Sequence, residues 1–566
     1  MKKVIFCLLG LSATTMLWAT VPVGYLPYSS APRYPNLAAD TLDPLRLRFN
    51  YLYEFSQIAD FIQSWQLDDP DSVDDGGMIE AESGPLRPVI QTDNTLEAIW
   101  VWSRYGQMTG DTSKYRNNID KARAYCERFP AWKEEGLEGQ NYYRMHNCAW
   151  GIAAEQMYRD VYADDGWTWY RDSCGIYMKT HKLNKWQILD RQVMGWCAGW
   201  LYKFGVETGD QVAIDTACVM ADSLIAFTEF KTPQVMLTDE YWAMSAGTIV
   251  WGICNSAFRQ DSMRGKEWII ENGPYLDTFQ VWRSIPNDYG WDNSWNVGYA
   301  NGHGAMHDIS RNPEYARRHL WLTNKLLSYD TDSDGGIMAS TQDSPDVDMC
   351  WVSSYLCMMG LDRLIGEVED KDAGVLEIAG IRDGDTIKKG TKVDLKAIVT
   401  NYGREPLTSI SVNLSGDAAG SWATDLGFLE SDTILMKSNW VVPETAILVL
   451  TTSHPEDMNH TNDTLRVGIN CFAKPGVREE ATVQNCMKLE IPQITSKSII
   501  VKYEIPPTTK GSLALYDIKG ALINKFYLCR STGQIDWNVS ELPKGVYFAR
   551  LESNEAAINR RVLLLR

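Results

Sequence analysis

The sequence predicts a multidomain protein, in which an all-α ring of helices over residues 45–370 precedes two all-β, immunoglobulin-like sandwiches. Three observations favour this fold class. A polar turn that opens a helix rich in Trp, Gly and Ala recurs about every 50 residues between positions 90 and 350. Two kinds of helical pattern alternate over the same stretch, and short strands with Gly, Asn and Asp turns follow it. With 566 residues the chain is too long for one core, so several domains are expected.

The N-terminus has the pattern of a secretory signal peptide over residues 1–19. A basic start precedes an apolar run over residues 4–17, and cleavage is expected after Ala19. Residues 20–44 are rich in Pro and Tyr and are expected to form an irregular lead-in. No later stretch offers about 18 uncharged apolar residues, so no membrane span is expected. The sequence therefore predicts a secreted or cell-surface protein.

Net charge and cysteine spacing exclude two classes of function. The formal net charge is -19, so no basic stripe is expected that could neutralise the phosphates of a nucleic acid. The 12 cysteines include no CxxC pair, which argues against a zinc–thiolate site. An acidic polysaccharide stays possible as a partner if the binding groove is locally basic.

Six polar openings precede the helices of the ring. They are Thr92-Asp93-Asn94, Met145-His146-Asn147, Leu189-Asp190-Arg191, Thr238-Asp239-Glu240, Trp291-Asp292-Asn293 and Asp346-Val347-Asp348. The helices that follow are apolar nearly all round and are expected to be buried. They alternate with amphipathic helices such as the one over residues 114–129, which have a wet outer face. About twelve helices result, six inner and six outer.

This alternation resembles the (α/α)6 toroid, an architecture shared by many glycoside hydrolases, polysaccharide lyases and terpenoid-cyclase-like proteins. The resemblance covers about 320 residues and no single motif assigns a family within it. It implies that the six openings gather at one mouth of the ring.

The acids of the openings have two interpretations. A single Asp at a helix start is more often an N-cap than a catalyst. However, Thr92 and Thr238 could cap instead, and several acids at one mouth must separate their pKa values by repulsion. Such separation supplies the acid and the base of glycoside hydrolysis. The predicted catalytic residues are Asp93, Asp239, Asp292 and Asp348, with Glu240 and His146 in reserve.

Tryptophans lie within a turn or so of these acids. The four predicted substrate-binding residues are Trp242, Trp291, Trp295 and Trp351. Sugar rings present apolar C–H faces that stack on indole rings. Core packing is the alternative for each of them taken singly.

Two Asp-Gly-Gly turns, at residues 74–79 and 334–338, look like one structural element used twice, which would form a strand-like excursion over the mouth. The second turn contains Asp330, Asp332 and Asp334, whose alternate oxygen ligands before a Gly suit Ca²⁺. The Glu that an EF-hand loop places six residues after its Gly is absent, and Thr341 stands there. The two interpretations are a calcium site and a solvated acidic turn, and no other cofactor is predicted.

Two β-domains follow the ring. Residues 390–403 alternate along a strand and end in Val399-Thr400-Asn401-Tyr402-Gly403, similar to the "V-x-N-x-G" turn of CARDB-type domains, which implies a sandwich over residues 375–475. Residues 490–566 carry the order "LYD-x-x-G … LP-x-G-x-Y … basic-V-L-L" from Leu515 onward. This order resembles the C-terminal sorting domain of the type IX secretion pathway and the related FlgD-like repeat. The resemblance implies export by outer-membrane secretion machinery.

The function predicted from these features is a secreted carbohydrate-active enzyme that cleaves the glycosidic bonds of a polysaccharide or oligosaccharide with paired carboxylates. A polysaccharide lyase is one alternative, with a base such as His146 and a charge neutraliser such as Arg191. A catalytically silent cell-surface scaffold that binds a glycan or peptide is another. A terpenoid-cyclase-like enzyme is disfavoured because no DDxxD run is present.

Overall fold

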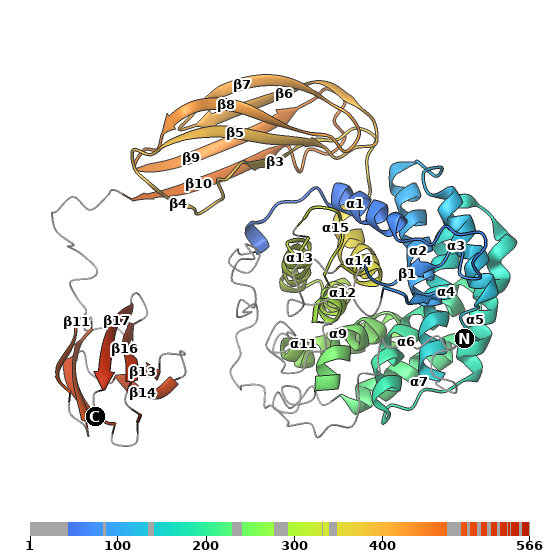
Figure 1. The fold of residues 1–566 in the computed structure, drawn as a ribbon, viewed down its shortest axis with the longest axis horizontal. Helices are drawn as coiled ribbons and strands as arrows, with labels where there is room; N and C mark the ends of the chain where they lie inside the picture. Colours follow the sequence, from blue (N-terminus) through green and yellow to red (C-terminus); the bar gives the residue numbers. More distant parts are fainter. Residues whose placement is uncertain are drawn as a thin grey trace. The chain divides into compact units, whose positions relative to one another are not determined.

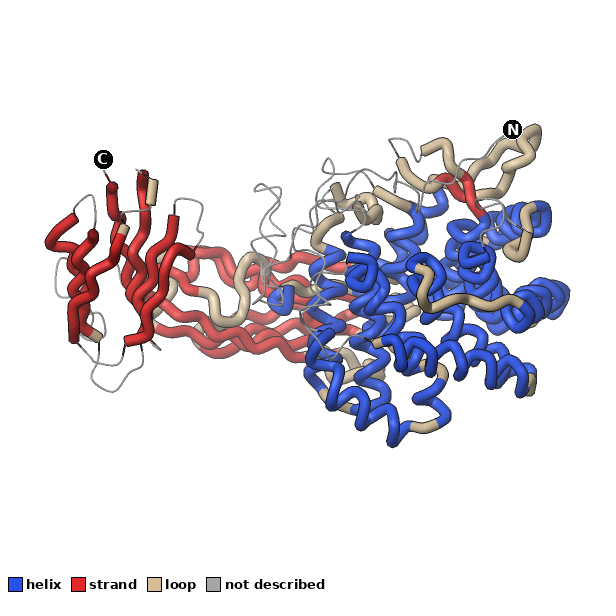
Figure 2. Tube along the Cα trace, turned by 90° about the horizontal axis from the view of Figure 1, so that it is seen from below, coloured by secondary structure: helices blue, strands red, loops and turns tan. Residues whose placement is uncertain are grey.

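The computed structural model forms two compact units, and both contain stretches that are described in detail. The first unit holds residues 1–387 and 391–471, and the second holds residues 388–390 and 472–566. The described residues are 44–82, 87–133, 141–228, 240–276, 292–330, 332–338, 348–472, 488–494, 498–505, 511–517, 522–528, 532–539, 542–543, 545–553 and 557–564. Apart from two short strands between residues 78 and 91, the helices come before residue 366 and the strands after residue 372 (Figure 2).

Six buried helices form the inner wall of a ring in the first unit (Figure 1). They are α2 (Thr92–Thr109), α4 (Asn141–Tyr162), α6 (Ile188–Thr208), α9 (Glu240–Cys254), α12 (Asp292–Ser310) and α14 (Cys350–Leu356). Each packs on the next, and α14 contacts both α12 and α2, so the ring closes. Because all six run in the same direction, their N-terminal ends share one mouth.

Outer helices return the chain between the inner ones. They are α1 (Tyr51–Ser64), α3 (Arg116–Arg128), α5 (Thr168–Thr180), α7 (Gln211–Phe227), α11 (Ser262–Leu276) and α13 (Pro313–Leu327). Short elements complete this part: η2 (Pro44–Arg46), η4 (Asp165–Trp167), α10 (Ala257–Gln260), η6 (Cys357–Leu361) and α15 (Asp362–Ile365). Within the described residues the predicted toroid of six inner and six outer helices is confirmed.

Two helix boundaries differ from the sequence prediction. The first helix was expected from Leu45, but Asn50 accepts the backbone N–H of Tyr53 and caps a helix that begins at Tyr51. Helix α4 begins at Asn141, one turn earlier than the polar opening at Met145. His146 therefore lies in the second turn of its helix and does not open it.

Small residues let the inner helices approach closely. A Cβ placed on Gly252 of α9 would lie 2.0 Å from the carbonyl oxygen of Gly195 on α6. No side chain fits at that distance, so the glycine is required by backbone-to-backbone packing. The Gly and Ala residues of the inner helices thus allow neighbouring helices of the ring to pack closely.

Short β elements cover the mouth. Strands β1 (Met78–Ile79) and β2 (Ile90–Gln91) pair antiparallel directly before α2. Bridges also pair Ala81 with Met349, and Met338 with Asp348. The chain before α2 and the chain before α14 are thereby hydrogen-bonded to each other.

The two Asp-Gly-Gly turns form the same element twice, as the sequence predicts. Gly76 and Gly335 have positive φ angles of 86° and 93°. A Cβ would lie 2.3 Å from the carbonyl oxygen of Lys121 at the first position, and 2.4 Å from that of Gln57 at the second. Each turn therefore rests on the backbone of an outer helix.

The residue after each Gly pair is held by a hydroxyl group of an inner helix. The backbone N–H of Met78 donates to Thr95 Oγ1 at 3.0 Å, and that of Ile337 donates to Ser353 Oγ at 2.9 Å. The mouth is thus built symmetrically on α2 and α14.

A β-sandwich follows the ring within the first unit. Its strands are β3 (Ala373–Ile378), β4 (Thr386–Lys388), β5 (Lys392–Asn401), β6 (Leu407–Gly416), β7 (Gly420–Leu426), β8 (Ser431–Val441), β9 (Thr445–Ser453) and β10 (Thr464–Phe472). They form a five-stranded sheet in the order β4-β10-β9-β6-β7 and a three-stranded sheet in the order β3-β5-β8. The two sheets enclose a shared apolar core. Its immunoglobulin-like and CARDB-like character stays a prediction.

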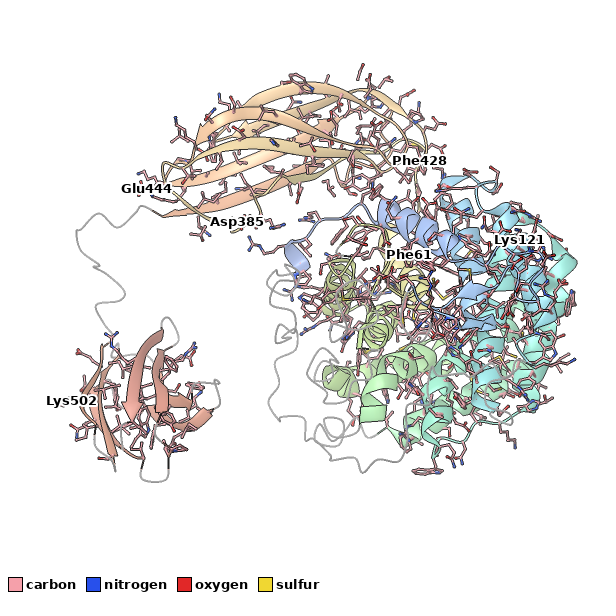
Figure 3. The ribbon with its side chains drawn as sticks, viewed as in Figure 1. Phe61, Lys121, Asp385, Phe428, Glu444 and Lys502 are labelled. Atoms are coloured by element: carbon pink, nitrogen blue, oxygen red, sulfur yellow. The ribbon has the colours of Figure 1, made fainter. Side chains whose placement is uncertain are left out.

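The sandwich is joined to the ring. Asn50 Nδ2 donates to Thr400 Oγ1 at 3.0 Å, and Arg404 Nε donates to the carbonyl oxygen of Met108 at 2.7 Å. Phe428, labelled in Figure 3, comes from the sandwich and packs against the apolar core of the ring. Met108 lies at the C-terminal end of α2, so this contact is at the end of that helix away from the mouth.

The second unit is all-β. Its strands are β11 (Lys488–Ile494), β12 (Ser498–Glu504), β13 (Gly511–Asp517), β14 (Leu522–Leu528), β15 (Thr532–Asn538), β16 (Gly545–Ser553) and β17 (Ala557–Leu564). They form sheets in the orders β11-β12-β15 and β14-β13-β16-β17 around an apolar core that includes Trp537. Among the described helices of the whole chain, none has the length and apolarity of a membrane span.

We expect Gly76→Ala to destabilise the protein more than Gly110→Ala. Both glycines have positive φ, which costs about 1–2 kcal/mol with Ala. A Cβ at Gly110 meets nothing within 4 Å, whereas at Gly76 it meets the Lys121 carbonyl, so about 1–3 kcal/mol of overpacking is added. Thermal unfolding checks this, and equal losses of melting temperature would contradict the packing argument.

Candidate active site at the toroid mouth

Four buried carboxyl groups gather where the first and last inner helices begin. Glu80, Asp93, Glu97 and Asp348 are 0%, 7%, 1% and 1% exposed. Asp93 lies in the first turn of α2, and Glu97 lies one turn later on the same face. Glu80 follows β1, and Asp348 precedes α14. The main chain brings these segments together, because the N–H of Cys350 donates to the carbonyl oxygen of Glu80 at 3.0 Å.

Asp93 is the most accessible of the four and is held by hydrogen bonds. Tyr143 of α4 donates its hydroxyl to Asp93 Oδ1 at 3.1 Å, and the backbone N–H of Asn94 donates to the same oxygen at 3.0 Å. Burial nevertheless raises the pKa of Asp93 to about 6, against the lowering effect of these bonds. The side chain can therefore gain and lose a proton close to neutral pH.

The residue expected to cap α2 has another partner. Thr92 was a candidate cap that would free Asp93, but its hydroxyl donates to the carbonyl oxygen of Phe129 at 2.6 Å. The residue at the N-cap position, Gln91, makes no side-chain capping bond. Neither Gln91 nor Thr92 thus takes the place of Asp93 as the cap of α2.

Glu97 is a buried acid without a compensating partner. Within the described part of the chain, neither of its carboxyl oxygens makes a hydrogen bond. Burial raises its pKa well above the usual value, and the nearby charges of Asp93 and Glu80 raise it further. Burial and the neighbouring acids therefore both favour the protonated form of Glu97.

Asp348 forms the other side of the cluster. One carboxylate oxygen each from Glu82, Asp334 and Asp348 lie within 4.8 Å of one another. The Asp348 side chain occupies the space above Gly336, where a Cβ would come within 2.4 Å of its Oδ2. The second Gly-Gly turn thus makes room for this carboxylate.

The thiol of Cys350 is buried beside these acids, since the backbone of Cys350 bonds that of Glu80. Burial raises its pKa well above the usual value, and the next contributions come from the charges of Glu80, Glu97, Asp348 and Glu82. Acids from both ends of the ring therefore act on one buried atom.

His146 lies beside an aromatic column. Its Nε2 is 3.3 Å from the hydroxyl of Tyr355, and burial lowers its pKa to about 4, so the ring is neutral at neutral pH. Tyr355 stacks on Trp150 with 5.3 Å between ring centroids, and Trp150 lies 4.7 Å from Trp196. These rings come from three inner helices, α4, α6 and α14, and hold them against one another.

Trp351 is 9% exposed and packs edge-on against Tyr355 at 5.3 Å. Core packing therefore accounts for this tryptophan, and its predicted part in substrate binding stays a prediction.

The remaining predicted residues cannot be placed at the same level of detail. Asp239 and Trp291 lie outside the described residues. Glu240 and Trp242 belong to α9, and Asp292 and Trp295 belong to α12, with only their helical backbone described.

The acids of the predicted calcium loop accept hydrogen bonds from the backbone of the same loop. Carboxylate oxygens of Asp330, Asp332 and Asp334 lie within 4.8 Å of one another, as a cation would require. However, Asp330 accepts the N–H groups of Ser333 and Gly335, and Asp334 accepts that of Gly336 at 2.7 Å. The turn is thus satisfied by its main chain, and calcium stays a prediction.

Sequence reasoning missed several members of the cluster, namely Glu80, Glu82, Glu97 and Tyr143. A signal was present for Glu97, because it lies four residues after Asp93 on one helix face. Glu80 directly follows the first Asp-Gly-Gly strand, whose role over the mouth was predicted. No sequence pattern indicated Tyr143.

Comparison with known families finds one match in the second unit. Residues 493–564 match the model of the secretion system C-terminal sorting domain. The predicted sorting domain is thereby confirmed, and with it the expectation of export. A search of curated proteins finds no match.

Solved structures with a similar fold include several sugar-cleaving enzymes. An inactive variant of an α-1,6-mannanase from Salegentibacter sp. HEL1_6, in complex with α-1,6-mannotetrose, is 13% identical, with 56% of this chain and 99% of that chain covered at a TM-score of 0.38. An unsaturated glucuronyl hydrolase specific for heparin is 11% identical. The match covers 56% of this chain and 94% of that chain, with a TM-score of 0.40. A β-arabinofuranosidase of family 127 is 11% identical. The match covers 90% of this chain and 93% of that chain, with a TM-score of 0.35. These low scores carry no weight for substrate or catalytic residues.

We expect Asp93→Asn to raise the melting temperature at pH 7 to 8. A carboxyl group whose folded pKa is raised destabilises the fold wherever it is ionised, so its removal stabilises by up to about 3 kcal/mol above pH 6. The gain should fade as the pH falls from about 6 to about 4.

Asp111→Asn is the matched control, for which the opposite change in melting temperature is expected. Asp111 follows α2, and a hydrogen bond from the hydroxyl of Ser113 lowers its pKa. Its removal should lower the melting temperature at neutral pH. Destabilisation by Asp93→Asn at neutral pH would show that Asp93 is a structural cap.

Proposed function

We propose that this protein is a secreted glycoside hydrolase whose active site is the acid cluster at the toroid mouth. The observation that carries the proposal is the pair Asp93 and Glu97, two buried acids on one helix face with no cation in contact among the described residues. Such burial costs stability, and buried acids with displaced pKa values occur preferentially at catalytic sites.

Asp93 and Asp348 are the proposed reacting pair. In glycoside hydrolysis one carboxylic acid gives a proton to the leaving oxygen while the carbon–oxygen bond breaks. A second carboxylate either activates the water that adds to the anomeric carbon or attacks that carbon itself. A pKa of about 6 suits Asp93 for proton transfer, because catalysis is most efficient when the pKa lies near the working pH.

Glu97 is proposed as a positioning residue. It lies one helical turn after Asp93 on the same face, and its proximity raises the cost of ionising both acids together. The hydroxyl of Tyr143 fixes Asp93 from the other side. The reactive carboxyl group would therefore keep one orientation in both protonation states.

Export supports an extracellular substrate. The match of residues 493–564 to a sorting domain indicates passage out of the cell. A polymeric glycan is the substrate class that such an enzyme meets there.

A polysaccharide lyase is the second candidate, because the neutral imidazole of His146 lies 3.3 Å from the hydroxyl of Tyr355. A histidine and a tyrosine in contact could remove the proton next to a uronate carboxylate. A lyase leaves a double bond in its product that absorbs ultraviolet light, and a hydrolase does not.

We expect Asp93→Asn and Asp348→Asn each to lower kcat/KM on a cleaved polysaccharide by about 10²-fold or more, as loss of a general acid or base does. Glu97→Gln should retain activity within about tenfold, because Gln preserves its neutral state and shape. Reducing-end release together with absorbance of the product measures both rate and reaction type.

Asp222→Asn serves as the control, because this carboxylate lies on the outer helix α7 and pairs with Arg264. Unchanged cleavage by the Asp93 and Asp348 variants would contradict the proposed pair. Ligand binding without any turnover in the unmodified protein would favour the binding scaffold.

A further inference from the structure

The loop that precedes α6 carries one exposed tryptophan, Trp186. Trp186 is 70% exposed, and its indole packs edge-on against Phe227 with 5.2 Å between ring centroids. The side chain of Asn184 accepts the backbone N–H of Trp186 at 3.1 Å, and Asp190 accepts that of Asn184 at 2.7 Å. The ring is therefore held in one place and still open to solvent.

Hydrogen bonds place this loop at the toroid mouth. Asn141, the first residue of α4, donates its side-chain amide to the carbonyl oxygen of Lys182 at 3.0 Å. It also accepts the hydroxyl of Tyr177 at 2.9 Å. Tyr143, two residues further along α4, contacts Asp93. One helical turn thus connects the loop with the acid cluster.

The loop is basic although the protein is strongly acidic. Lys182 is exposed and Lys185 is half-buried, and within the described residues neither forms an ion pair. The ammonium group of Lys185 lies 5.5 Å from the centroid of the Trp186 ring. Arg191 adds a third positive charge and donates to the carbonyl oxygen of Lys185 at 3.2 Å. Two lysines without an ion pair among the described residues, next to an exposed indole, are notable in a chain with a net charge of -19.

The described acidic groups near the loop have other partners than Lys182 and Lys185. Asp190 uses one oxygen on the backbone of Asn184. Lys179, at the end of α5, is already paired with Asp210. Within the part of the chain that the structure describes, Lys182 and Lys185 are therefore available for an external anion.

We propose that Trp186, Lys182 and Lys185 form a binding subsite for an anionic polysaccharide at the rim of the mouth. The apolar C–H face of a sugar ring stacks on the indole of Trp186, and a carboxylate or sulfate on the same chain binds the two lysines. This assignment rests on the proposed function, because it extends the substrate from the cleavage site to a sugar unit beyond it.

Charge complementarity favours a charged glycan over a neutral one. A neutral chain would gain the stacking contact and hydrogen bonds from the ammonium groups to sugar hydroxyls, but no attraction between opposite charges. Electrostatic attraction also depends on ionic strength, because the Debye length shrinks to about 8 Å at 0.15 M salt and about 3 Å at 1 M. The subsite should therefore release its ligand as salt increases.

The test is affinity electrophoresis of the full chain in gels containing polygalacturonate, alginate, heparin, mannan or hydroxyethyl cellulose. We expect retention by at least one anionic polymer and weaker retention by the neutral ones. Trp186→Ala and the double variant Lys182→Gln/Lys185→Gln should each weaken binding about tenfold, which is about 1.4 kcal/mol. Only the contribution of the lysines should disappear at high salt.

Two control variants match the changes in side chain and exposure. Trp422→Ala removes an indole that is 58% exposed on the β-sandwich, and Lys266→Gln removes an exposed lysine on α11. Neither should change retention. Unaltered melting temperatures show that the variants are folded.

Two results would overturn the proposal. One is that none of the anionic polymers retains the protein, and the other is that retention survives Trp186→Ala and the double lysine change. The outcome is separate from that of the proposed function. Retention through Trp186 without cleavage refutes only the hydrolase, whereas cleavage of a neutral polymer that Trp186→Ala leaves unchanged refutes only the subsite.

Discussion

The closure of the ring through main-chain hydrogen bonds between its first and last hairpins is the constraint on which the site depends. The N–H of Cys350 donates to the carbonyl oxygen of Glu80, and the N–H of Glu82 donates to that of Asp348 at 3.2 Å. These bonds fix segments that are about 270 residues apart in sequence. Without them the carboxyl groups of α2 and α14 would have no fixed relation to each other.

The cluster that results opposes folding. Buried acids without cations are costly, and the two Gly-Gly turns add residues that only glycine can occupy. The surrounding ring offsets this cost through close helix packing, such as the contact between Gly195 and Gly252. A stable scaffold that carries a locally unfavourable site is what a catalytic function requires.

Much of this architecture could be predicted from the sequence. The alternation of apolar and amphipathic helices gave the inner and outer layers, and the repeated Asp-Gly-Gly turn gave the symmetry of the mouth, because both are local patterns with a fixed period. The partners of Asp93 could not be predicted in the same way. Tyr143 reaches Asp93 from the next inner helix, and only the packing of α4 on α2 determines that they meet. Trp351 packs against Tyr355, a contact between two inner-helix side chains that sequence reasoning missed.

The contact between Asn50 and Thr400 has a consequence for the order of assembly. Asn50 caps the helix that begins the toroid, and its side-chain amide is also tied to a strand 350 residues later. Local helical hairpins can form early, but contacts of such long sequence separation form late. The ring can therefore close through its own segments before the sandwich exists, and the bond between Asn50 and Thr400 joins the two only afterwards.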